Sequence, residues 1–267
     1  MLYLAGKSGI FSPPRTNFLS HFYKSKRPAY HYICGKQRKQ IVQAYRFTLH
    51  GQTLWLSPER CIYWEEQHAL IVSDLHFGKI GHFRKSGIAV PQSVYKEDMQ
   101  RLVNQLQFYK PEQLIVVGDL FHSTQNKELD FFKKWRNDFQ QLQIHLVKGN
   151  HDILSKNWYN EANIIVSEQH LIVDRFCFIH DMSGACSTTD GIDYHISGHI
   201  HPCVVLRGLG KQSISLPCYF FSENYAVLPA FSKFTGGSPM ENKTSDHVFA
   251  IIAANASRGQ LAAVIKV

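Results

Sequence analysis

The sequence has 267 residues, of which 44% are hydrophobic and 13% aromatic, enough apolar material for a sizeable core, so a largely disordered chain is excluded. The formal net charge is +8, but residues 1–40 carry eight Lys or Arg and no Asp or Glu. Removing those eight from the 29 basic residues leaves 21 against 21 acidic ones in 41–267, so overall charge is weak evidence that the folded body binds nucleic acid.

Residues 1–40 are expected to form a flexible, basic N-terminal arm, and residues 41–267 a single domain. The arm is compatible with a transit peptide, a disordered tail or translation upstream of the true start. No secretory signal is visible, and no apolar run approaches the ~20 residues that span a membrane. The six scattered cysteines form no CxxC pair, which predicts buried or free thiols and a cytoplasmic location.

The strongly patterned sequence begins near Ile41. Apolar residues alternate over 45–49 and 54–56, with His50-Gly51 between them as a turn, which predicts a hairpin. Three apolar runs then alternate with two segments of helical spacing, which predicts a parallel sheet covered on both faces. The strands are expected at 69–72, 114–117 and 144–147; the first helix carries Tyr95, Met99, Leu102 and Leu106 after Pro91, and the second carries Leu129, Phe132, Trp135, Phe139 and Leu142.

The second half of the chain carries short strand patterns with few helix signals. This predicts a second, mainly antiparallel sheet packed with the first, so the fold class is α/β, a two-sheet β-sandwich flanked by helices. These strands are expected at 175–180, 194–197, 213–219, 225–228, 247–252 and 261–267.

Five of the predicted strands end in Asp, His or Asn, which packing alone does not explain. The carboxyl edge of an open α/β sheet is where ligands bind. On an extended backbone, alternate side chains project to one side, so each Asp-x-His or His-x-His pair is expected to reach one metal centre. Gly118 and Gly149 would permit close backbone approach at sharp turns. The candidate ligands are Asp74, His76, Asp119, Asn150, His180, His199 and His201.

This ligand set mixes imidazole, carboxylate and amide oxygen without thiolate. It favours two divalent ions, Mn²⁺ first with Fe or Zn²⁺ as alternatives, over a structural zinc site. Two such ions clamp a phosphate and activate water, so the set predicts phosphoester hydrolysis.

The candidate ligands lie in five motifs along the chain: Val72-Ser73-Asp74-Leu75-His76, Gly118-Asp119, Gly149-Asn150-His151-Asp152, His180 and Gly198-His199-Ile200-His201. In this order they resemble the five motifs of calcineurin-like metallophosphoesterases. The resemblance implies that Asp74, His76 and His201 hold one metal, that Asn150, His180 and His199 hold the other, and that Asp119 bridges them. It makes His151 the catalytic histidine, and Asp152 is either its orienting partner or a turn-capping residue.

Longer motifs, spread over nearly all of 41–267, surround and follow the candidate ligands. They are Asp74-Leu75-His76-Phe77-Gly78-Lys79, His82-Phe83-Arg84, Gly118-Asp119-Leu120-Phe121-His122-Ser123, Ser197-Gly198-His199-Ile200-His201-Pro202, Leu216-Pro217-Cys218 and Leu228-Pro229-Ala230-Phe231. With these motifs the chain resembles the SbcD-related, ligase-associated DNA damage response endonucleases of the PdeM type. This narrower resemblance implies cleavage of DNA, single-stranded or damaged, with a DNA ligase and a helicase-like protein as repair partners.

The resemblance favours substrate contacts by His82 and Arg84. His122 is either a substrate contact or a loop histidine, and Lys79 either contacts phosphate or belongs to a solvated basic face. Trp135 and Phe139 are expected in the core. The neutral body keeps a rival open, a phosphodiesterase or phosphatase acting on nucleotides or other small phosphoesters. A scaffold that has lost its metals is disfavoured because no ligand of the set is missing.

Overall fold

The computed structural model describes residues 30–31, 41–42, 44–79, 93–122, 127–184, 191–192, 194–208, 212–254 and 261–267. Of the predicted arm, only the backbone of β1 (Tyr30–His31) is described, paired antiparallel with β2 (Ile41–Val42). The predicted flexibility of the arm otherwise falls outside the described residues. Within the described residues, the helices are too short or too polar to cross a membrane.

The first sheet has seven strands and confirms the predicted hairpin and parallel strands. In spatial order the strands are β3 (Tyr45–Leu49), β4 (Gln52–Ser57), β5 (Cys61–Trp64), β6 (Ala69–Val72), β7 (Gln113–Val117), β8 (Gln143–Val147) and β9 (Ile164–Ser167). Neighbouring strands are antiparallel from β3 to β6 and parallel from β6 to β9. The sequence patterns missed β5 and β9.

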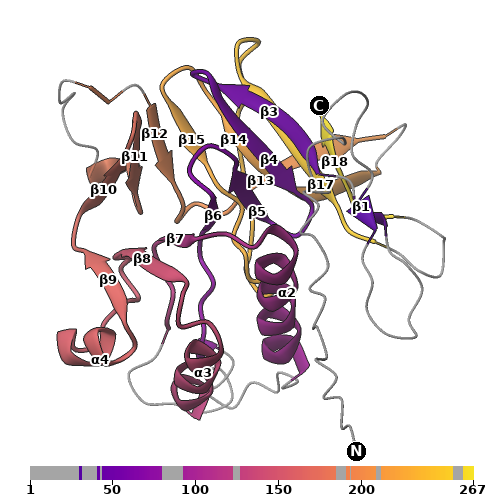
Figure 1. Ribbon diagram of the computed structural model, residues 1–267. Helices are drawn as coiled ribbons and strands as arrows, with labels where there is room; N and C mark the ends of the chain where they lie inside the picture. Colours follow the sequence, from indigo (N-terminus) through magenta and orange to yellow (C-terminus); the bar gives the residue numbers. More distant parts are fainter. Residues whose placement is uncertain are drawn as a thin grey trace, which may run out of the picture.

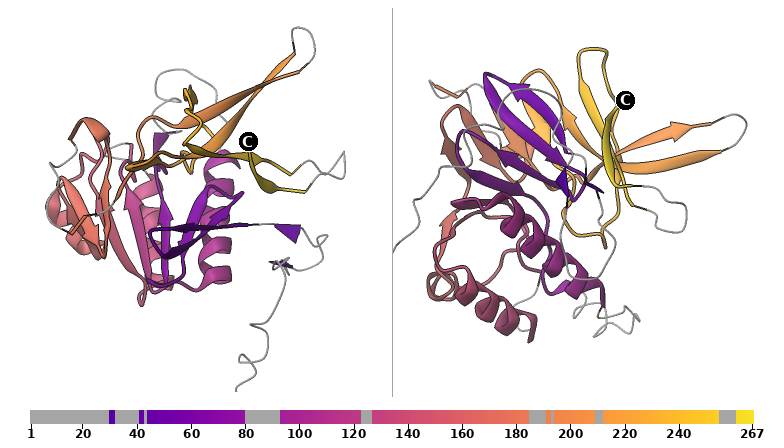
Figure 2. Two further views of the ribbon diagram at one scale, coloured as in Figure 1. Left: turned by 90° about the horizontal axis from the view of Figure 1, so that it is seen from above. Right: turned by 45° about the vertical axis from the view of Figure 1, so that its right-hand side comes forward.

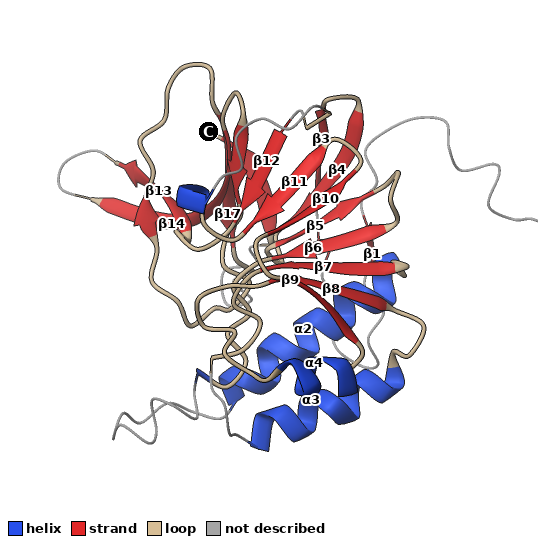
Figure 3. Cartoon of the chain, turned by 90° about the vertical axis from the view of Figure 1, so that its left-hand side faces the viewer, coloured by secondary structure: helices blue, strands red, loops and turns tan. Residues whose placement is uncertain are grey.

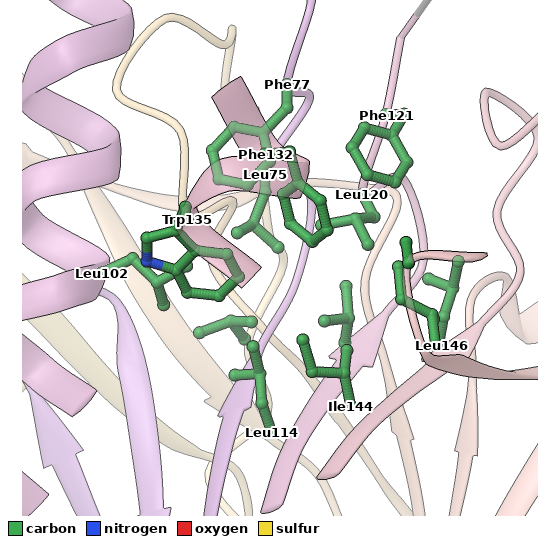
Figure 4. Close-up of a cluster of buried hydrophobic side chains, with 14 of the residues drawn as sticks. Leu75, Phe77, Leu102, Leu114, Leu120, Phe121, Phe132, Trp135, Ile144 and Leu146 are labelled. Carbon is green, nitrogen blue, oxygen red and sulfur yellow. The ribbon is translucent and has the colours of Figure 1, made fainter. Parts of the chain in front are cut away.

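Three helices cover one face of this sheet: α2 (Ser93–Tyr109), α3 (Lys127–Asp138) and α4 (Lys156–Glu161), as Figures 1 and 3 show. Their apolar faces and the sheet enclose one buried cluster, which includes Leu102, Phe132 and Trp135 (Figure 4). Burying such side chains stabilises the fold by about 1.5–3 kcal/mol each.

The second helix, α3, ends earlier than the apolar pattern in the sequence predicts. It ends at Asp138, so Phe139 and Leu142 lie in the turn that follows, although Phe139 still packs against the core. The cause is the buried side chain of Arg136, which donates to the carbonyls of both residues and to that of Ala162. A local pattern cannot reveal this tertiary contact.

The second sheet has nine strands: β10 (His170–Val173), β11 (Phe176–Ile179), β12 (Tyr194–Ser197), β13 (Pro202–Arg207), β14 (Ser213–Phe221), β15 (Tyr225–Val227), β16 (Ser238–Pro239), β17 (His247–Ile252) and β18 (Ala263–Lys266). Its main path is β10-β11-β12-β15-β14-β13-β16, and β17 pairs with both β14 and β18. The sheet is mainly antiparallel, as predicted, but β11, β12 and β15 run parallel.

The two sheets pack face to face through a second buried cluster. The ring of Phe47 lies 4.7 Å from that of Phe221 and 5.1 Å from that of Phe249, while Trp64 packs on Phe176 at 4.9 Å between ring centroids. Hydrophobic faces thus explain the layer order of helices, first sheet and second sheet. The β13–β14 hairpin extends away from these layers (Figure 2).

Candidate metal centre

Six of the seven candidate ligands form two groups. Asp74, His76 and His201 make up one, and Asp119, His180 and His199 the other, with the ligand atoms of each group within 4.8 Å of one another. The seventh, Asn150, has its Oδ1 3.1 Å from Nε2 of His180 and so adjoins the second group.

Asp119 lies between the groups. Its Oδ1 is 3.5 Å from Nε2 of His180, and its Oδ2 is 3.9 Å from Nδ1 of His76. A carboxylate in this position can offer one oxygen to each of two ions, which is the geometry of a bridging ligand.

The first group presents buried polar atoms that lack a hydrogen-bond partner among the described residues. Oδ2 of Asp74 accepts from the hydroxyl of Ser73 and, at 3.1 Å, from the backbone N–H of His199. Its Oδ1 and both ring nitrogens of His76 have no such partner within the described chain, and Oδ1 lies 3.3 Å from Nε2 of His201. Burial, aided by the charge of Lys79, lowers the pKa of His76 to about 3, so its ring is neutral and able to bind a cation.

His180 organises the second group. Its Nδ1 lies 3.3 Å from the carbonyl oxygen of Val117, which favours the tautomer with hydrogen on Nδ1 and directs Nε2 at the other ligands. Nδ1 of His199 is 3.2 Å from that Nε2. Burial lowers the pKa of His180, but the hydrogen bond and charge of Asp119 outweigh it and raise the pKa to about 9.

These residues fit two divalent cations. Buried oxygen and nitrogen atoms without hydrogen-bond partners would be costly unless a cation satisfied them. The donors are imidazole, carboxylate and amide oxygen, which suits Mn²⁺, Fe or Zn²⁺. The grouping agrees with the ligand division implied by the superfamily motifs.

The backbone at the ligands is left-handed rather than extended. Asp74, His76, Asp119, His199 and His201 have φ values of 53°, 50°, 52°, 68° and 55°. The expectation that His-x-His reaches one centre through an extended backbone is therefore wrong: His199 and His201 fall in different groups. Left-handed residues other than glycine are uncommon and cluster at functional sites, where surrounding contacts enforce them.

Three glycines make this crowding possible: Gly118 and Gly149, for which the sequence predicts close backbone approach, and Gly198, for which it does not. A Cβ on Gly118 would overlap the ring of His180, and a Cβ on Gly149 would overlap the carboxylate of Asp119. A Cβ on Gly198 would overlap the side chains of Ser73 and Asp74. Gly198 therefore lets the second sheet approach Ser73 of the first sheet closely. The spacing of residues in the sequence does not reveal this contact.

The ligand loops of β6 and β7 stay paired beyond their strands. The N–H of His76 donates to the carbonyl of Asp119 at 2.8 Å, and that of Phe77 to Leu120 at 2.9 Å. Leu75, Phe77, Leu120 and Phe121 then insert into the core cluster between the sheet and the helices (Figure 4). Polar ligands thus alternate with apolar anchors, so the hydrophobic core holds the metal centre.

Comparison with known proteins agrees with this centre. A family model described as calcineurin-like phosphoesterase matches residues 68–182, which include Asp74, Asp119 and Asn150. The crystal structure of Pseudomonas putida nuclease MPE is similar, with a TM-score of 0.67 and 27% sequence identity over 84% of this chain and 100% of that chain. Residues 68–182 therefore form a calcineurin-like phosphoesterase domain. The chain is a hydrolase of phosphoester bonds with the α/β sandwich of the metallophosphoesterase superfamily.

A second structure, the protein of unknown function AQ665 from Aquifex aeolicus, has 20% identity and a TM-score of 0.36 over 54% of this chain and 82% of that chain. No curated protein matches the sequence significantly.

Beside the metal groups of this phosphoester hydrolase lies a pair of histidines. The ring of His151 is 4.2 Å from that of His122 and 5.4 Å from that of His76, measured between centroids. The backbone N–H of His151 donates to Oδ1 of Asp119 at 2.9 Å. The ring of His122 is 5.5 Å from that of His76, so both histidines lie beside the first group, and their catalytic and substrate-binding roles stay predictions.

Asp152 is fully buried, and both of its carboxylate oxygens accept backbone N–H groups. The N–H of Phe121 donates to Oδ1 and that of Gly149 to Oδ2, each at 2.9 Å. Burial raises the pKa of Asp152 to about 6, against these hydrogen bonds. The contacts agree with its turn-capping interpretation; the orienting of His151 stays a prediction.

The remaining expectations divide between described and undescribed residues. His82 and Arg84 lie outside the described residues, while Lys79 is partly buried and donates its N–H to the carbonyl of His76 at 3.1 Å. Trp135 and Phe139 belong to the core cluster, as expected. Cys61, Cys177, Cys203 and Cys218 are buried thiols.

Proposed function

We propose that this phosphoester hydrolase is an endonuclease that hydrolyses phosphodiester bonds in DNA, with single-stranded or damaged DNA as the substrate and repair as its setting. The observation that carries the proposal is the likeness to Pseudomonas putida nuclease MPE, whose whole chain is covered at 27% identity. The narrower resemblance to ligase-associated endonucleases, which extends through Leu228-Pro229-Ala230-Phe231, supports the same substrate.

Asp74, His76 and His201 would hold one ion, Asn150, His180 and His199 the other, and Asp119 both, with Mn²⁺ as the first candidate. Two divalent ions bound there supply positive charge to the phosphate and lower the pKa of water. The chain contributes fixed positions for the ligands: buried hydrogen bonds hold Asp74 and Asp119 so that one oxygen of Asp74 and both of Asp119 face the imidazoles.

His151 is the proposed general acid. It belongs to neither ligand group, and its ring is partly exposed beside them, so it can face the leaving oxygen and donate a proton as the phosphoester bond breaks. His122, whose ring lies against that of His151, is proposed to contact the substrate from the same side.

A second candidate function is hydrolysis of nucleotides or other small phosphoesters. The formally neutral charge of 41–267 favours it, because a body that binds long DNA through many phosphates usually carries a basic surface. Both functions use the same metal groups and differ in what flanks the scissile phosphate.

The test compares the full chain, with Mn²⁺, on circular single-stranded DNA, relaxed duplex DNA, nucleotides and an aryl phosphodiester. We expect the single-stranded circle to be linearised faster than the duplex is nicked, with no cleavage in EDTA. The logarithm of DNA affinity should fall with the logarithm of salt concentration with a slope of about 0.7 per contacted phosphate. Faster turnover of nucleotides than of the DNA circle, with a shallow salt slope, would instead establish the small-molecule function.

A further inference from the structure

A cluster of four charged side chains, two buried and two partly buried, lies outside the metal centre. Arg101 and Asp98 project from α2, and Glu59 and Arg60 lie in the turn between β4 and β5. Arg101 is 7% exposed and Asp98 is 4% exposed; Nη2 of Arg101 is 3.4 Å from Oδ1 of Asp98, and Nε is 3.6 Å from Oε2 of Glu59. Burial, followed by the charge of Arg101, lowers the pKa of Arg60 to about 10, so Arg60 remains charged at neutral pH. Charges buried in this way are costly unless they make specific contacts.

The cluster holds one loop, residues 230–233, which includes the end of Leu228-Pro229-Ala230-Phe231. Arg101 donates to the carbonyl of Phe231, and its guanidinium carbon lies 4.2 Å from the centre of that ring. Nη1 of Arg60 donates to the carbonyls of Ala230 at 3.2 Å and Ser232 at 2.8 Å. The N–H of Lys233 donates to Oδ2 of Asp98 at 3.3 Å. Three successive carbonyls and one N–H of the loop are therefore bound by the cluster.

The other edge of the same loop holds a candidate metal ligand. The N–H of Phe231 donates to the carbonyl of Ser73 at 2.7 Å, and the N–H of Ser232 to the carbonyl of Asp74 at 3.2 Å. Asp74 has a left-handed backbone, with φ of 53°, that depends on such contacts to persist. The loop thus connects the arginines to the residue whose Oδ1 faces His201.

We propose that Arg101, assisted by Arg60, is a positioning residue for the ion that Asp74, His76 and His201 hold. The planar guanidinium fixes the loop, and the loop fixes the backbone of Ser73 and Asp74 through one hydrogen bond to the carbonyl of each. This inference deepens the proposed function and rests on its metal centre, but not on DNA as the substrate. It also assigns a physical task to the Ala230-Phe231 part of a motif that metal ligation leaves unexplained.

Arg101→Lys tests the proposal, because it keeps the charge and loses the planar fork. Arg136→Lys is the matched control: Arg136 is also a buried arginine, 5% exposed, and donates to the carbonyls of Phe139, Leu142, Ala162 and Asn163, away from the segment of Asp74. Binding is measured as free Mn²⁺ by electron paramagnetic resonance during titration, and folding by circular dichroism and melting temperature.

We expect the unaltered chain to bind two Mn²⁺ ions. Arg101→Lys should lower the affinity for one of these ions by about 10- to 100-fold, as loss of a contact that supports a ligand typically does. The affinity for the other ion should stay unchanged. Its activity on an aryl phosphodiester should recover at high Mn²⁺. Arg136→Lys should lower the melting temperature yet bind both ions normally. If Arg101→Lys does not fold, Arg60→Lys should lower the affinity for one of the two ions in the same way.

Normal affinity for both ions in a folded Arg101→Lys or Arg60→Lys would overturn the proposal. An equal loss of affinity for both ions would also overturn it, and so would a selective loss of affinity for one ion in Arg136→Lys. Each of these results indicates general destabilisation. An unaltered chain that binds fewer than two ions would overturn this proposal together with the metal centre. An unaltered chain that binds two ions and cleaves no DNA would refute only the DNA substrate.

Discussion

Asp119 is the residue whose carboxylate lies against both ligand groups. One of its oxygens lies 3.5 Å from His180 and the other 3.9 Å from His76, and it also accepts the N–H of His151. His180 and His151 lower the pKa of Asp119 to about 2 against the opposing effect of burial, so it is ionised wherever the protein is folded near neutral pH.

Asp119→Ala should therefore lower hydrolysis of an aryl phosphodiester at saturating Mn²⁺ by at least about 1000-fold, because it removes several kcal/mol of transition-state charge stabilisation. His199→Ala should have a similar effect. Initial rates are compared with those of Asp138→Ala, a control at the exposed end of α3. Most of the activity remaining in folded Asp119→Ala would refute the site assignment.

At the scale of elements, the metal centre depends on how the strands end. β7 runs into Gly118, whose φ is 77° and whose missing Cβ leaves room for the ring of His180 from the other sheet. Gly51, in the turn between β3 and β4, has a similar φ of 80° but no atom within 4 Å of where a Cβ would lie. The two glycines share a backbone requirement and differ in packing.

Gly118→Ala should abolish most Mn²⁺-dependent activity and destabilise the fold by more than the 1–2 kcal/mol, approximately, that a left-handed backbone costs an L-residue. Gly51→Ala should show only the backbone cost and keep full activity. Urea unfolding and initial rates check both variants. Equal activity in the two would mean that the space beside His180 is not needed for catalysis.

At the scale of the whole molecule, each ligand group draws on both sheets. Asp74, His76 and Asp119 follow strands of the first sheet, whereas His180, His199 and His201 follow strands of the second. The packing of the sheets therefore assembles the centre. Every ligand lies between residues 74 and 201, well past the basic segment 1–40.

Deletion of residues 1–40 should leave turnover of an aryl phosphodiester unchanged, because the segment supplies no candidate ligand. DNA affinity should fall and the salt slope should shrink, since eight basic residues are lost. Steady-state kinetics and fluorescence anisotropy at several salt concentrations measure the two effects. A folded truncation that lost small-substrate turnover would show that the segment is part of the catalytic domain.

The sequence by itself determined the parallel strands, the two-sheet class and the identity of the candidate ligands. Apolar runs such as 69–72 predict buried strands because a strand covered on both faces has no polar positions, and polar residues at five strand ends have no packing role. Short or half-buried strands such as β5, β9 and β13 lack that contrast and were missed. The end of α3 was misjudged because a tertiary contact from Arg136 sets it.

Only the tertiary structure decided how the backbone of the ligands is supported. The left-handed backbone of Asp74 and His199 is held by hydrogen bonds between segments 125 residues apart, and Arg101 reaches Phe231 across 130 residues. No local pattern encodes such contacts, because they exist only once the two sheets pack. Residue type therefore identified the chemistry of the centre, and long-range packing determined its geometry.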